Sequence, residues 1–259
     1  MNSHFPAPLP LMIALAAVLA CPTASFAQVK VIMSGGFSAA FEELLPAFEK
    51  TTGITVTTTR GPSQGDGPNT IGAQLRRGVP ADVVILSREG LDDLIAEGRI
   101  VTKSDVDLAQ APLGMSVRAA APKPDISSVD AFKQTLLRAK SITFPNSTTG
   151  IYMTTKLFPQ LGIASAIEGK ITHTGVAAVA NGESEIAIQP VSELLHAPGV
   201  EFVGTLPAQI QYISVFSAAL VAGSKQPEAS QRLISFLRSE EAATAIRKSG
   251  MEPRRVSRQ

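Results

Sequence analysis

Three loops of this 259-residue chain gather residues that can bind an anion. Each loop follows an expected β-strand, and all are rich in serine, threonine, glycine or asparagine. Two lead directly into expected helices, whose first backbone N–H groups lack a helical partner and favour negative charge. Ligands bind at the carboxyl ends of strands in open α/β sheets. The candidate binding residues in these loops are therefore Ser34, Gly35, Gly36, Phe37, Arg60, Ser63, Gln64, Ser147, Thr148 and Thr149.

Arg60 is the natural carboxylate clamp, because a planar guanidinium can bind both carboxylate oxygens. A surface arginine at a strand end is the ordinary alternative, and the glycine-lined loop beside it favours the binding role. Ser147, Thr148 and Thr149 could hold an anion with the helix N–H groups behind them. A plain N-cap cluster is the alternative there, and neighbouring residues can fill both roles.

A metal site is not expected. Only His173 and His196 lie beyond the first 27 residues as borderline ligands, the single cysteine is Cys21, and neither histidine has a metal-binding spacing.

Alternating strand and helix patterns must position these loops, which indicates the α/β class. Crossings between two lobes are expected near 112–124 and 211–222. We therefore assign 28–114 and 215–259 to lobe 1 and 115–214 to lobe 2. Expected strands are 29–33, 54–59, 81–86, 114–120, 141–144 and 185–188, and expected helices are 37–48, 70–77, 91–97, 151–161, 227–238 and 239–248.

Residues 1–27 are typical of an export signal, with a short apolar run over 9–20 and small residues before an expected cleavage after Ala27. A lipoprotein modified at Cys21 is less favoured, because Leu19 is bulky for that motif.

No other apolar run could span a membrane. A net charge of +1 gives no case for nucleic acid. We expect a periplasmic monomer with no membrane insertion after cleavage.

Three segments are similar to the periplasmic molybdate-binding proteins of ABC transporters: VIMSGGFSAAFEELLPAFEKTTGITVT, GVPADVVILS and ISVFSAALVAGSKQPEASQRLISFL. The resemblance covers almost the whole chain after residue 27. It implies a two-lobed type II periplasmic binding protein fold with a ligand cleft between the lobes. In that family, two loop serines hold the oxyanion.

This chain departs from the molybdate pattern at three places. Gly36 stands at the first serine position with Ser34 displaced toward the strand, the second loop is longer although Ser63 matches its serine, and Gln189 replaces a tyrosine. The glycine and the longer loop suggest a roomier cleft. Four segments instead resemble the bacterial aconitate isomerases, a branch with the same fold: SGGFSAAF, GPSQGDGP, PNSTTGIY and NGESEIAIQPVSELLHAPGVEFVGTLP.

That resemblance implies an exported enzyme that interconverts trans- and cis-aconitate, a tricarboxylate, without a cofactor. The reaction needs a base to take a methylene proton and donors to hold the resulting enediolate-like carboxylate. Asp66 and Tyr152 are the first candidates for the base, followed by His173 and His196. Asp66 could instead bond its own turn, Tyr152 could pack with its hydroxyl at the rim, and the histidines could be loop residues.

The alternative function is a substrate-binding protein that delivers a molybdate-like oxyanion or a tricarboxylate to an ABC permease. A sensor or adaptor that presents its closed form to a receptor is a third option. In all three functions the same residues bind a small anion, and only the isomerase function requires a catalysed reaction.

Overall fold

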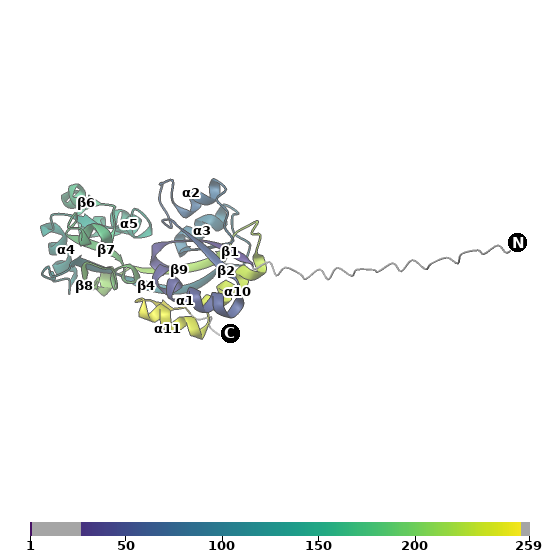
Figure 1. Cartoon of the computed structure of the whole chain (residues 1–259). Helices are drawn as coiled ribbons and strands as arrows, with labels where there is room; N and C mark the ends of the chain where they lie inside the picture. Colours follow the sequence, from purple (N-terminus) through teal and green to yellow (C-terminus); the bar gives the residue numbers. More distant parts are fainter. Residues whose placement is uncertain (2–26, 255–259) are drawn as a thin grey trace.

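Two lobes lie side by side, joined by two long strands that run between them (Figure 1). This computed structural model describes Met1 and residues 27–254. The expected signal segment, with Cys21, lies outside the described residues except for its two ends. The two-lobed α/β architecture expected from the sequence is confirmed.

Lobe 1 is a sheet in the order β2-β1-β3-β9-β4, with helices on both faces. Val29, Val31 and Met33 of β1 pack toward α1, α10 and α11, whereas Ile32 packs toward α2 and α3, as strand alternation requires. Its elements are β1 (Gln28–Met33), η1 (Gly35–Phe37), α1 (Ser38–Thr52), β2 (Thr55–Arg60), α2 (Ile71–Arg76), β3 (Val83–Ser87), α3 (Arg88–Ala96), the first half of β4 (Val106–Arg118), β9 (Ile213–Leu220), α10 (Pro227–Leu237), α11 (Glu240–Lys248) and β10 (Glu252–Pro253).

Lobe 2 is built on the second half of β4, which pairs with β7 on one side and β8 on the other. Its core joins these strands to the helices that cover them. The elements are α4 (Val129–Arg138), β5 (Ile142–Thr143), α5 (Thr148–Tyr152), a π-helical segment (Met153–Leu157), α6 (Phe158–Leu161), α7 (Ala164–Ile167), η3 (Glu168–Lys170), β6 (Ile171–Thr172), α8 (Val176–Ala180), β7 (Ile186–Pro190), α9 (Val191–Leu194), β8 (Val200–Thr205) and η4 (Ala208–Ile210).

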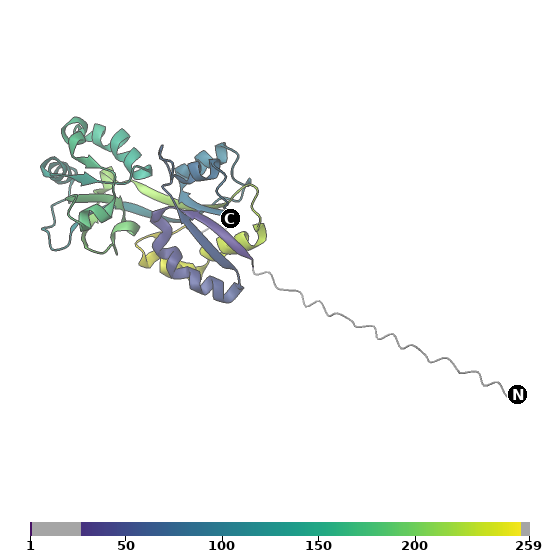
Figure 2. The same cartoon turned by 45° about the horizontal axis from the view of Figure 1, so that its top comes forward.

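The strand β4 carries the chain from one lobe to the other (Figure 2). Pro112 pairs with Ile213 of β9 in lobe 1, and the next residue, Leu113, pairs with Pro190 of β7 in lobe 2. The change of partner therefore falls between Pro112 and Leu113. The chain therefore passes from lobe 1 to lobe 2 within one continuous strand.

Candidate active site between the lobes

A cavity of about 430 Å³ lies where both lobes contribute residues. It takes the carboxyl ends of β1, β2 and β3 from lobe 1, and the loop before α5 and the end of β7 from lobe 2. Three larger hollows, of about 570, 610 and 720 Å³, each belong to a single lobe. The lining residues are Ser34, Gly35, Arg60, Gly61, Pro62, Ser63, Asn69, Ser87, Pro145, Ser147, Thr148, Thr149, Pro190, Glu193, Ser214 and Phe216.

Serine hydroxyls form the lobe 1 wall. The Ser34 N–H donates to the Ile85 carbonyl at 2.8 Å, while its buried Oγ has no hydrogen-bond partner in the described chain. Ser63 Oγ accepts the Ser87 N–H at 2.9 Å, which fixes its position. A buried hydroxyl without a partner is costly, so the Ser34 Oγ at the cavity is suited to bind a ligand oxygen.

Hydrogen bonds join the lobes across the cavity. Thr148 Oγ1 donates to Gln64 Oε1 at 3.0 Å and lies 2.8 Å from Ser87 Oγ, so Ser87 is the donor in that second pair. The Gln64 N–H donates to Ser147 Oγ at 3.2 Å. Two of the three loops predicted from the sequence therefore bond to each other directly, and the first, with Ser34 and Gly35, lines the same cavity.

Glu193 contributes the one carboxylate among the lining residues. It is partly exposed on α9, and Gln189 at the end of β7 donates from Nε2 to Glu193 Oε2 at 2.5 Å. Burial raises the pKa of Glu193 to about 7, against a smaller lowering effect of the Gln189 bond. A Cβ on Gly35 would lie 3.3 Å from Oε2, so the glycine leaves room for this carboxylate between the lobes.

Arg60 lines the cavity, but its guanidinium is paired with Glu42. Both side chains are about half exposed or more, at 49% and 64%. The predicted clamp is thus at the cleft and engaged with a protein carboxylate. Exposed ion pairs contribute little to stability, so a ligand carboxylate can displace Glu42 at small cost.

Two expectations for the first loop are corrected. Gly36 does not widen the cleft: a Cβ there would lie 2.0 Å from the Phe216 ring, so the glycine makes room for Phe216, which itself lines the cavity. Phe37 is fully buried in the lobe 1 core, because η1 turns its side chain into the apolar face shared with α1.

Several candidates lie outside the cavity lining. Asp66 is exposed in its loop. Tyr152 donates to the Ile210 carbonyl at 3.0 Å and stacks on Tyr212 at 4.7 Å, and burial raises its pKa. His173 and His196 contact the carbonyls of Phe144 and Lys248. Gln64 and Gln189 do not line the cavity themselves, but they form hydrogen bonds with Thr148 and Glu193, which do.

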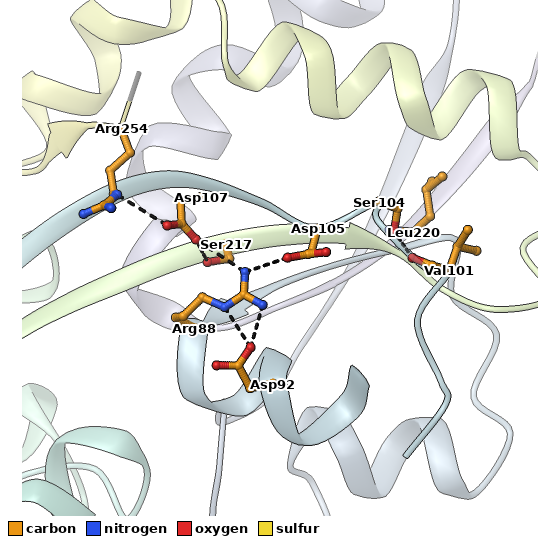
Figure 3. Close-up of polar contacts among 9 residues, drawn as sticks. All are labelled: Arg88, Asp92, Val101, Ser104, Asp105, Asp107, Ser217, Leu220 and Arg254. Atoms are coloured by element: carbon orange, nitrogen blue, oxygen red, sulfur yellow. Dashed lines mark hydrogen bonds and ion pairs between the residues drawn. The ribbon is translucent and has the colours of Figure 1, made fainter. Parts of the chain in front are cut away.

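The start of α3, which carries Ser87 as its cap, is held by a charged cluster (Figure 3). Arg88 donates to Asp92 at 2.6 and 2.9 Å and to Asp105 at 2.9 Å. It also lies 3.5 Å from Asp107 on β4, which accepts from Ser217 on β9 at 2.7 Å. The cluster ties α3 to both crossing strands, and so helps to place Ser87 at the cavity.

Sequence reasoning missed Ser87 and Glu193. Both follow strands that had been expected, β3 and β7, so the rule that ligands bind at carboxyl strand ends applied to them as well. Glu193 also stands four residues after Gln189, but Gln189 ends β7 and Glu193 lies on α9, so no helical spacing links the two in the sequence.

In the part of the chain that the structure describes, no group of three His, Cys, Asp or Glu could hold a metal ion. The same residues include no helix long and apolar enough to cross a membrane.

A family model described as bacterial extracellular solute-binding protein matches residues 29–252. The chain belongs to this family. It is 41% identical over 227 residues to the aconitate isomerase of a Pseudomonas species, covering 86% of this chain and 87% of that protein. It is 25% identical over 252 residues to the molybdate-binding protein ModA of Azotobacter vinelandii, covering 93% and 96%. The resemblance to the isomerase branch is confirmed.

Solved structures of the same fold include two anion-binding proteins. The Azotobacter vinelandii periplasmic molybdate-binding protein matches with a TM-score of 0.71 at 20% identity, over 89% of this chain and all of that one. The sulfate-binding protein SubI of Mycobacterium tuberculosis matches with a TM-score of 0.68 at 20% identity, over 88% and 87%. At these identities the likeness establishes the two-lobed fold alone.

Proposed function

We propose that the chain is an aconitate isomerase, which interconverts trans- and cis-aconitate by cofactor-free transfer of an allylic proton. The observation that carries this proposal is the 41% identity to an aconitate isomerase over most of both chains. The cavity supports it, because it combines one carboxylate with a wall of hydroxyls and a candidate carboxylate clamp.

The cavity residues divide into binding and stabilising roles. Arg60 and the lobe 1 serines bind two substrate carboxylates through charge-assisted hydrogen bonds. Thr148, Thr149 and the N–H groups that open the helical run from Thr148 to Leu161 face the third carboxylate, where negative charge grows in the transition state. The inter-lobe bonds of Gln64 and Ser87 hold the cleft closed and exclude water.

We also propose that the protein acts in the periplasm as a monomer, after export and cleavage behind Ala27. The match to an extracellular solute-binding family supports export. An ABC permease is a partner only if the protein is a binding protein, the function that its likeness to ModA favours as the alternative.

The two functions separate in one experiment on the mature protein after chelator treatment. We expect conversion of trans-aconitate to cis-aconitate, followed by chromatography, and calorimetric binding of aconitate in preference to molybdate or sulfate. Tight molybdate binding without conversion at high protein concentration would make it a transport protein instead.

A further inference from the structure

The cleft carboxylate that sequence analysis passed over has a geometry suited to proton transfer. Glu193 is fixed through one oxygen only: Gln189 Nε2 donates to Oε2 at 2.5 Å, while Oε1 makes no hydrogen bond with any residue that the structure describes. The free oxygen belongs to a residue of the cavity lining. A base held by one oxygen and open at the other can accept a proton from a bound ligand.

We propose that Glu193 is the base of the allylic proton transfer and that Gln189 is its positioning residue. This inference rests on the proposed function. Glu193 takes a proton from the substrate methylene carbon, and the C–H electrons form a new C=C bond within a dienolate that extends into the carboxylate. The old C=C bond then accepts the same proton at its far carbon, which restores the Glu193 carboxylate and balances the reaction.

Two neighbours maintain this arrangement. Gly35 of η1 brings lobe 1 backbone against the carboxylate, since even a Cβ at that position would lie 3.3 Å from Oε2. Gln189 is 2% exposed at the end of β7, and its Nε2 bond to Glu193 is its one side-chain hydrogen bond among the described residues, since its Oε1 is buried without a partner there. Gln189 thus fixes the carboxylate orientation from lobe 2, while closure of lobe 1 over it brings the substrate into reach.

The charge environment leaves Glu193 ready to act as a base near neutral pH. Its pKa of about 7 results from burial, opposed by the Gln189 hydrogen bond. The other charged residue of the cavity lining, Arg60, is paired with Glu42. In the described chain, four elements pack against α9. Of these, η1 and β7 carry no charged residue, β4 carries Asp107 and Arg118, and β8 carries Glu201.

Glu193→Gln tests the assignment, because it removes the base and keeps the side-chain shape. We expect kcat to fall by about 10²- to 10⁴-fold, with the calorimetric Kd for trans-aconitate changed by less than about threefold. Glu201→Gln, which removes an exposed carboxylate of the same lobe, is the matched control and should keep the wild-type rate.

Gln189→Leu tests the positioning role through the pH dependence of kcat/KM, which the loss of a purely structural residue would leave unchanged. Since the lost hydrogen bond had lowered the pKa of Glu193, the acidic limb of the kcat/KM profile should shift to higher pH. An unchanged profile would contradict the positioning role.

Failure of the assignment can be told from failure of the function. An active wild type with a Glu193→Gln variant within about threefold of it would overturn Glu193 as the base and leave the isomerase intact. A wild type inactive on both isomers would overturn the function and the assignment with it.

Discussion

Burial makes the ionised form of Glu193 unfavourable, and the same burial would make its carboxylate a stronger base. Its pKa is about 7 in the folded chain and about 4.5 when unperturbed, so the folded state binds its proton more tightly. Stability from this group is therefore fully present below about pH 4.5 and is lost as pH rises through 7. Above pH 7, the ionised side chain lowers the free energy of unfolding by up to about 3 kcal/mol.

Glu193→Gln should consequently be more stable than the wild type at pH 8 and similar to it at pH 4. Thermal unfolding followed by circular dichroism across this range measures the difference. We expect a gain of several degrees in Tm at pH 8. If the Tm difference between Glu193→Gln and the wild type does not increase between pH 4.5 and 7, the raised pKa of Glu193 is contradicted.

Arg60 should exchange Glu42 for a substrate carboxylate. Arg60→Ala then removes a charge-assisted bond of about 1.5–3 kcal/mol and raises the Kd for aconitate roughly 10- to 100-fold. Glu42→Gln is the control: it frees the guanidinium, and because the pair is exposed, affinity should improve by less than about 1 kcal/mol. If Arg60→Ala binds as the wild type does, Arg60 is only a surface partner of Glu42.

At the scale of elements, the sequence predicts long periodic segments well and single turns poorly. The strand before Ser34 and the helix after it were expected within a few residues, because apolar periodicity sets them. The four-residue helix α9 lacks enough residues for a period, so Glu193 was missed. Likewise, Phe216 and Gly36 contact each other across 180 positions of sequence, which no local pattern reports.

The element α3 also contacts the second crossing, through Tyr212. The Tyr212 hydroxyl donates to Glu89, whose other oxygen is buried without a partner among the described residues. Burial and this carboxylate raise the pKa of Tyr212, which therefore stays a neutral donor. The contact links the start of α3 to the chain just before β9.

Tyr212→Phe should lower the free energy of unfolding by about 1–3 kcal/mol, because it leaves Glu89 without a donor. Its stacked neighbour supplies the control, since Tyr152→Phe removes a neutral bond to the Ile210 carbonyl that contributes about 0.5–1.5 kcal/mol. Urea unfolding of both variants gives the comparison. A loss in Tyr152→Phe equal to or greater than that in Tyr212→Phe would contradict this account of Glu89.

At the scale of the whole molecule, two lobes joined by continuous strands make a cavity that exists only when they meet. Gln64 and Ser87 of lobe 1 contact Thr148 of lobe 2, so closure and assembly of the site are one event. A solute-binding protein needs such closure to retain its ligand. An enzyme on the same scaffold uses it to exclude water from a carbanionic intermediate.

The central claim is that this closed cleft catalyses an isomerisation rather than storing a ligand. The most direct measurement is proton NMR of the chelator-treated protein with pure trans-aconitate in one sample and pure cis-aconitate in another. A catalyst brings both samples to the same isomer ratio, and Glu193→Gln should approach that ratio far more slowly. If both samples keep their starting isomer at high protein concentration, the cleft binds without chemistry and the claim is wrong.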